Sequence, residues 1–92
     1  MRILIIEDDP NLNDQIKLSL EESGYSVDIA MDGEEGHFLG DTEPYDAVIL
    51  DLGLPKLDGI TVLEKWRKEK KNFPVLILTA RDQWSDKVSG FD

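Results

Sequence analysis

The sequence predicts an α/β fold, a doubly wound parallel sheet with helices on both of its faces. Short apolar runs, several of them rich in β-branched residues, alternate along the chain with amphipathic segments. The resulting order is strand, helix, strand, helix, strand, helix, strand. Right-handed crossovers between such strands make them parallel members of one sheet.

Four apolar segments are predicted to be strands because their composition is typical of buried strands in parallel sheets. Glycine, proline or helix-start residues separate them from the segments that follow. The predicted strands are residues 2–6, 25–30, 47–50 and 75–78, and Asp51 and Thr79 follow the last two directly.

The first predicted helix begins at Asp8-Asp9-Pro10, an acidic cap with proline in the first turn. Its apolar residues recur every four positions, at Leu12, Ile16 and Leu20, and Gly24 ends it. A second helix over residues 32–40 is predicted to be weak, because Gly36 and Gly40 disfavour a helix.

A third helix is predicted to follow the turn Leu52–Asp58, with Asp58 as its cap. We expect its apolar face to consist of Ile60, Leu63 and Trp66, or the aliphatic stem of Arg67. A fourth helix is expected to start at Asp82 or Ser85.

Length and composition limit the classes of protein that fit. The 92 residues make one small domain, and the absence of cysteine excludes disulfides and thiol chemistry. A net charge of −10 disfavours direct binding to nucleic acid. The apolar start, residues 1–6, is too short for a signal peptide or a membrane span, so we expect a cytoplasmic protein with no membrane contact.

Acidic residues stand where predicted strands end. The first strand runs into Glu7-Asp8-Asp9 and the third into Asp51. Ligands of parallel α/β sheets bind beyond the carboxyl ends of the strands, so neighbouring first and third strands would bring these carboxylates into one crevice. Like charges about 4 Å apart repel by roughly 4 kcal/mol at an effective dielectric of 20, so such a cluster needs protons or a cation.

The chemistry of these side chains favours magnesium as the cation. All the ligands on offer are oxygens, which suits a hard ion, and magnesium binds one or two carboxylates together with water and phosphate. The alternative for Asp8 and Asp9 is that they only cap the first helix, and this alternative is favoured for Asp9.

Three segments resemble the receiver domains of two-component response regulators, and the resemblance runs the full length of the chain. Residues 3–9 resemble the opening strand and acidic pocket of that family. Residues 48–59 match its phosphoacceptor segment, D-x-x-x-P-x-x-D-G, and residues 75–81 match its fourth strand and switch threonine. The sequence of residues 78–82 is most similar to that of receivers attached to winged-helix transcription factors.

The resemblance implies a flavodoxin-like receiver fold with strand order 2-1-3-4-5 and a role for each matching residue. Asp51 is the phosphoacceptor, and a sensor histidine kinase is the donor. Magnesium is held by Asp8 directly, by Glu7 through water, by Asp51 and by the backbone carbonyl of Gly53. Thr79 contacts the phosphoryl group as the switch residue, and Ala80 leaves room for that group. Such a domain assists its own phosphoryl transfer and is not classed as an enzyme.

The family's pattern continues beyond Asp92, so residues 1–92 are interpreted as a receiver domain truncated at its C-terminus. The resemblance implies that a phosphate-contacting lysine, a switch aromatic, the fifth strand and the fifth helix are missing, as is a DNA-binding output domain. Lys56 is near the site in sequence but lies on a loop, and it is not expected to replace the lysine. The uncovered strand edge at residues 75–78 is expected to make the chain associate with a second copy. One form of this association is an exchange of secondary-structure elements between the two copies.

A phosphohydrolase and a binding or dimerisation module are the two alternative functions. A phosphohydrolase with an aspartate nucleophile would carry a second acid at position 53, where this chain has Gly53. A binding or dimerisation module without phosphorylation remains open for a chain that lacks the lysine. The basic run over residues 65–71 is interpreted as a solvated helix end. His37 is not expected to bind metal or phosphate, and Trp66 is expected in the core. For Trp84 a core position and a half-exposed position on a partner surface are both compatible with the sequence.

Overall fold

Four parallel strands form one sheet in the order β2-β1-β3-β4. The computed structural model describes residues 1–78 of the chain. The elements follow the predicted alternation: β1 (Arg2–Ile6), α1 (Pro10–Glu22), β2 (Ser26–Ala30), α2 (Gly33–Thr42), β3 (Ala47–Asp51), α3 (Gly59–Lys68) and β4 (Val75–Leu78).

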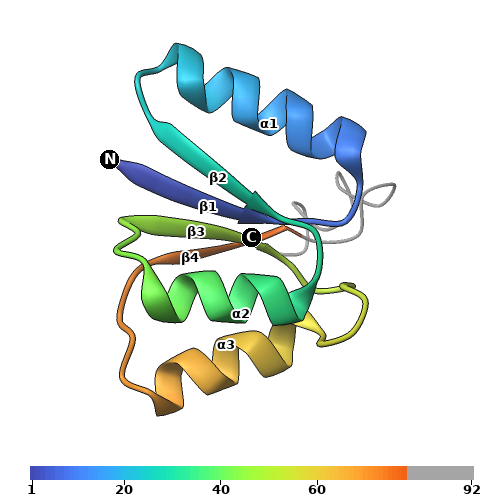
Figure 1. The fold of residues 1–92 in the computed structure, drawn as a ribbon, viewed down its shortest axis with the longest axis vertical. Coiled ribbons are helices and arrows are strands. Elements are labelled where there is room, and N and C mark those ends of the chain that lie inside the picture. Colours follow the sequence, from blue (N-terminus) through green and yellow to red (C-terminus); the bar gives the residue numbers. More distant parts are fainter. Residues whose placement is uncertain (79–92) are drawn as a thin grey trace, which may run out of the picture.

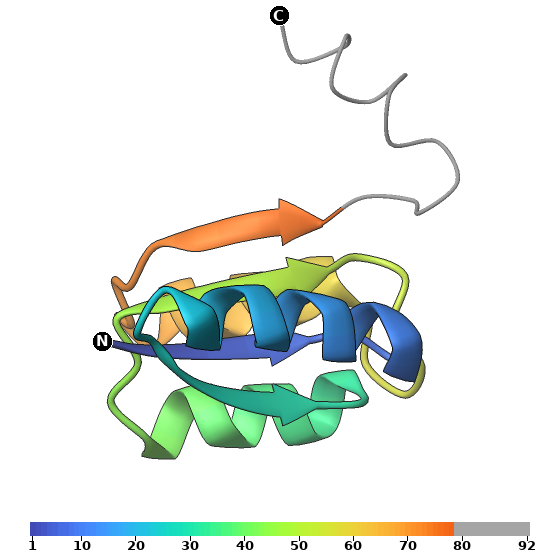
Figure 2. The same cartoon turned by 90° about the horizontal axis from the view of Figure 1, so that it is seen from above.

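Helices cover both faces of the sheet, as the doubly wound fold requires. Helix α1 lies on one face, and α2 and α3 lie side by side on the other (Figure 1). Seen from above, β2 and β4 are the two edges of the sheet, and β1 and β3 lie between them (Figure 2). The predicted fold class and the predicted order of these strands are therefore confirmed, and β1 and β3 are neighbours.

The pairing register brings the ends of β1 and β3 together. Ile6 pairs with Leu50, so Glu7 and Asp51 follow at the same edge of the sheet. On the face that packs against α2 and α3, the core is fully buried and contains Leu4, Ile6, Val48, Leu50, Val62 and Trp66.

Helix α2 is longer than predicted, and its glycines have a packing role. Asp32 is the N-cap, and the helix runs to Thr42 rather than ending at Gly40. Gly36 lies directly against the side chain of Ile6, and Gly40 lies against the indole of Trp66, so neither position has room for a Cβ atom. Close packing of α2 against the sheet and α3 requires glycine at these two positions. The lower helix propensity of glycine is therefore a consequence of this packing.

The predicted apolar face of α3 is corrected at one residue. Trp66 is fully buried and Leu63 is half-buried, but Ile60 is 49% exposed. Val62 is buried in its place. Because Gly59 and Val62 face the sheet at the start of the helix, Ile60 lies on the other side of the same turn.

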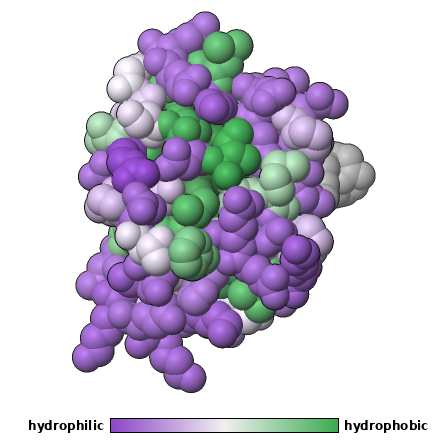
Figure 3. Space-filling view, viewed as in Figure 1, coloured by the Kyte–Doolittle hydropathy of each residue, from purple (hydrophilic) through white to green (hydrophobic). Residues whose placement is uncertain are grey.

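The opposite face of the sheet is covered less completely. The apolar stripe of α1 is half-buried over the β2 side of the sheet, while Leu76 of β4 is 66% exposed. Hydrophilic side chains dominate the face that Figure 3 shows, with a hydrophobic strip between α1 and α2 at the level of the strands. Within residues 1–78, no helix combines the length and the hydropathy that crossing a membrane requires.

Candidate metal and phosphoacceptor site

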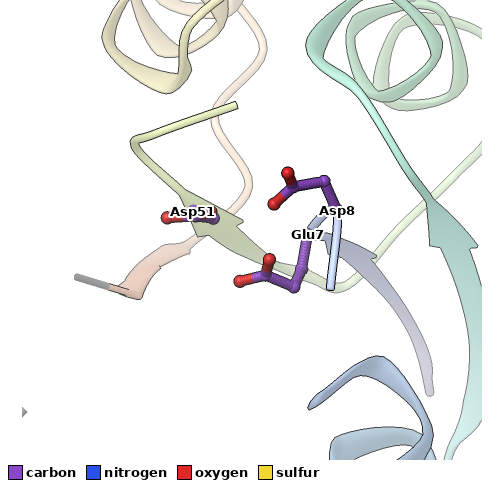
Figure 4. A group of neighbouring side chains, drawn as sticks. All are labelled: Glu7, Asp8 and Asp51. Atoms are coloured by element: carbon purple, nitrogen blue, oxygen red, sulfur yellow. The ribbon is translucent and has the colours of Figure 1, made fainter. Parts of the chain in front are cut away.

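Three carboxylates meet at the carboxyl ends of β1 and β3. One oxygen from each of Glu7, Asp8 and Asp51 lies within 4.8 Å of the others. The three side chains point into the same space, Glu7 and Asp8 from the segment after β1 and Asp51 from the last residue of β3 (Figure 4). The predicted convergence of these acids is therefore present in the structure.

Backbone hydrogen bonds hold the segment that follows β1. The Glu7 N–H donates to the Ala30 carbonyl of β2 at 3.1 Å, which continues the sheet by one residue. The Asp9 N–H donates to Glu7 Oε2 at 2.8 Å. Asp9 itself is the N-cap of α1 and accepts from the N–H groups of Asn11 and Leu12. Asp9 thus caps the helix, as expected, while Asp8 points into the cluster.

The loop between β3 and α3 frames the other side of the site. The Gly53 N–H donates to Asp51 Oδ1 at 3.2 Å. Lys56 has a positive φ of 68° in this loop, and its ammonium lies 3.6 Å from Asp32 at the start of α2. Asp58 caps α3 by accepting from the Thr61 N–H at 2.9 Å, as predicted. Lys56 is therefore paired away from the acidic cluster.

The site concentrates negative charge in a buried place. Glu7 and Asp51 are each only 2% exposed. Burial, with the neighbouring charges of Asp51 and Asp8, raises the pKa of Glu7 to about 7. Asp8 Oδ1 and Asp51 Oδ2 are buried without a hydrogen-bond partner among residues 1–78. Buried carboxylate oxygens without donors are costly, and a bound cation would satisfy them.

The donor set fits a magnesium ion. It contains oxygens alone, and Asp8 and Asp51 each have one buried oxygen without a hydrogen-bond partner among residues 1–78. Magnesium suits a site with few carboxylates that leaves positions open for water and phosphate. No histidine joins this cluster: His37 lies on α2, and its Nε2 is 3.2 Å from Oε1 of Glu69, the residue that caps the C-terminus of α3.

Several predicted residues lie elsewhere or outside the described part. Thr79, Ala80 and Trp84, and the predicted start of a fourth helix at Asp82 or Ser85, fall outside residues 1–78. The basic side chains Lys65, Arg67 and Lys68 occupy the last turn of α3, as a solvated helix end would.

Asn13 is a buried residue beside the site whose role was not predicted from the sequence. This residue is 1% exposed, and its side-chain amide donates to the Glu7 carbonyl at 2.7 Å. A signal was available in the sequence: Asn13 is spaced three and seven residues from Ile16 and Leu20, so a polar residue shares their buried stripe.

Comparison with known proteins places this geometry in a family. The model of the response regulator receiver domain matches residues 3–92. The transcriptional regulatory protein QseB of Haemophilus influenzae is 49% identical over 90 residues, which are 98% of this chain and 41% of QseB. The chain thus spans about two fifths of the length of this curated relative.

Solved structures agree with the family match. A response regulator, TrrA of Thermotoga maritima in complex with Mg²⁺ and BeF, has a TM-score of 0.82 at 37% identity, covering 98% of this chain and 78% of that one. TrrA in complex with the histidine kinase ThkA has a TM-score of 0.79 at 37% identity, covering 90% of this chain and 78% of that one. The chain belongs to the response-regulator receiver family of two-component systems.

Proposed function

We propose that this chain is a phosphoacceptor receiver that takes a phosphoryl group from a sensor histidine kinase onto Asp51, with Mg²⁺ as cofactor. The observation that carries the proposal is the cluster of Glu7, Asp8 and Asp51, in which two buried oxygens have no hydrogen-bond partner among residues 1–78. The complex of the similar TrrA with a histidine kinase supports the choice of donor. Within this proposal residues 1–92 form one receiver domain.

Each residue of the site has its own role in metal binding or phosphoryl transfer. Asp8 and Asp51 would hold a bound ion directly, Glu7 would hold it through water, and the Gly53 carbonyl would complete the protein's ligands. The ion would supply positive charge that offsets the charge of the transferring group. An Asp51 oxygen attacks phosphorus, the P–N bond of the phosphohistidine breaks, and the electron pair returns to the imidazole. Thr79 and Ala80 contact and accommodate the phosphoryl group, as the resemblance implies.

Gly53 has a second role in this reaction, through its backbone N–H. It donates to Asp51 Oδ1 and keeps the carboxylate in one orientation before the donor arrives. An oriented carboxylate loses less freedom on reaching the transition state than a rotating one, which is the advantage of a preformed site. The chain assists transfer to itself, and no turnover of a separate substrate is proposed.

The output of the parent protein is proposed to be transcription control. QseB is named as a transcriptional regulatory protein, and this chain spans only 41% of it. With a net charge of −10, residues 1–92 are poorly suited to hold DNA themselves. DNA contact would therefore come from a separate output domain, and phosphorylation would act on that domain through the receiver. We place this activity in the cytoplasm.

The 92-residue chain is also proposed to associate with a second copy through β4. Among the described strands β4 pairs only with β3, and the β4 residue Leu76 is 66% exposed. An apolar strand with a free edge pairs readily with an identical strand, and exchange of elements is one way to do so. Sedimentation of the wild type and Leu76→Lys tests this: a concentration-dependent dimer weakened by the substitution supports it, and a monomeric wild type contradicts it.

Intact mass after incubation with a small phosphodonor and Mg²⁺ tests the phosphoacceptor proposal. We expect a gain of one phosphoryl group that is lost in Asp51→Asn and with a chelator. If the chain gains none, the assay is repeated with a longer form that includes a fifth strand and helix. Failure of the longer form would overturn the proposal. Success of the longer form alone would favour the alternative for residues 1–92, a binding or dimerisation module.

A further inference from the structure

We infer that Asn13 is a positioning residue for the metal site, which it orders through the peptide bond between Glu7 and Asp8. The inference rests on the proposed magnesium function. It assigns to α1 a part in that function that the residues at the strand ends do not supply by themselves. Asn13 lies on α1, and its side chain is almost completely buried.

The first observation is the hydrogen bond that Asn13 makes. Its Nδ2 donates to the Glu7 carbonyl at 2.7 Å. That carbonyl belongs to the peptide unit linking Glu7 to Asp8, the two acids that the segment after β1 contributes to the cluster. The Glu7 N–H on the preceding peptide unit is held by the Ala30 carbonyl at 3.1 Å. The Glu7 backbone is thus fixed on one side by β2 and on the other by α1.

The second observation is that Asp8 has little else to hold it. Asp8 Oδ1 is buried without a hydrogen-bond partner among the described residues. Repulsion from Glu7 and Asp51 would turn the side chain outward in the absence of a cation. The direction of the Asp8 side chain therefore depends on its backbone, and Asn13 fixes the orientation of the peptide unit that precedes it.

The third observation is that asparagine at position 13 lowers the stability of the fold. Asn13 Oδ1 is also buried and has no partner within residues 1–78. A leucine would bury a similar volume without an orphaned acceptor, so stability alone does not favour asparagine here. The other contact of the amide is a 3.3 Å approach to the Met31 sulfur, which is a weak acceptor. The strong donation to Glu7 is what the asparagine contributes.

The test compares Asn13→Leu with Met31→Leu, a matched control that removes the amide's other partner and leaves the Glu7 contact in place. Binding of Mn²⁺ as a probe for divalent ions is followed by loss of the free-ion electron paramagnetic resonance signal. We expect Asn13→Leu to bind about tenfold more weakly, in the range of losses of supporting residues around metals, and Met31→Leu to bind as the wild type does. Equal binding by Asn13→Leu and wild type would overturn the inference.

A second readout separates positioning from a general structural role. In the phosphodonor assay, we expect Asn13→Leu to raise the Mg²⁺ concentration for half-maximal modification about tenfold while the rate at saturating Mg²⁺ stays near that of the wild type. A lowered maximum with unchanged Mg²⁺ dependence would overturn the inference. If neither the wild type nor Asp8→Asn bound any divalent ion, the proposed magnesium function would be wrong, and the inference that rests on it would be wrong as well.

A measurement on the wild type covers the case in which Asn13→Leu does not fold. The side-chain amide protons of Asn13 are followed by NMR in the metal-free protein. Slow exchange with water before Mg²⁺ is added is the expected result, because the hydrogen bond to Glu7 exists in advance of the ion. Rapid exchange that slows only on addition of Mg²⁺ would show that the ion orders Asn13, and the inference would be wrong.

Discussion

Gly40 of α2 packs directly against the indole ring of Trp66 in α3, with no room for a side chain between them. The same indole donates from Nε1 to the His37 carbonyl one turn earlier in α2, and its ring meets Phe73 edge-on with a centroid separation of 4.9 Å. This contact sets how closely α2 and α3 approach and thereby fixes the layer beneath β1 and β3.

Gly40→Ala is therefore expected to destabilise the domain, although alanine is the better helix former. The added methyl would overpack the contact with Trp66 and cost about 1–3 kcal/mol of unfolding free energy. Urea denaturation measures it, with Glu64→Ala on the exposed face of α3 as a control that stays within about 0.5 kcal/mol of wild type. In a Trp66→Phe background the methyl has more room, so Gly40→Ala should cost less there. An equal cost in both backgrounds would contradict the contact.

The sequence carried enough information for the sheet and its order because patterns of strands and helices are local. The end of each strand was also readable, and with it the meeting of Glu7 and Asp51. The role of Gly36 and Gly40 was not readable, because their partners Ile6 and Trp66 are distant in sequence and only packing brings them together. The position of Asn13 in the stripe of Ile16 and Leu20 marks it as buried, but its hydrogen bond to the Glu7 carbonyl is not predictable, because a backbone acceptor leaves no trace in the residue pattern.

The misassigned face of α3 gives a prediction of its own. Val62→Ala should cost about 2 kcal/mol because it empties space in a fully buried position, whereas Ile60→Ala should cost less than about 0.5 kcal/mol. Both changes shorten a β-branched side chain of the same helix, so helix propensity affects them alike. Denaturant midpoints of the two variants decide the matter. A larger loss at Ile60 would restore the face expected from the sequence.

Asp8 and Asp9 are adjacent acids with different tasks, and amide substitutions should separate them. Asp8→Asn should raise the thermal midpoint of the metal-free protein, since it relieves repulsion worth about 1 kcal/mol or more, and should abolish stabilisation by Mg²⁺. Asp9→Asn removes the same charge but keeps a good N-cap for α1, so Mg²⁺ should stabilise it as it does the wild type. Thermal melts with and without Mg²⁺ measure both effects. Loss of the Mg²⁺ response in Asp9→Asn alone would reverse the assignment.

The far edge of the sheet supplies a prediction about pH. Hydrogen bonds from Tyr45 at 2.7 Å and Arg2 at 2.7 Å hold the pKa of Asp28 below its usual value. A carboxyl whose folded pKa is depressed stabilises the protein fully above its unfolded pKa, about 3.9, and that stability is lost as the pH falls through the folded value.

Asp28→Asn should accordingly cost about 1 kcal/mol near pH 7, a modest value because the ion pair with Arg2 is partly exposed. The difference in unfolding free energy between wild type and variant should stay constant down to about pH 5 and shrink below about pH 4, as Asp28 becomes protonated in the wild type. Asp46→Asn is the control, because within the described part of the chain the Asp46 side chain accepts only from the Arg2 N–H at 2.8 Å, and its substitution leaves the Asp28 pair in place. A difference between wild type and Asp28→Asn that persisted unchanged to pH 2 would mean that the Asp28 charge does not stabilise this edge, and that Tyr45 and Arg2 act there through packing alone.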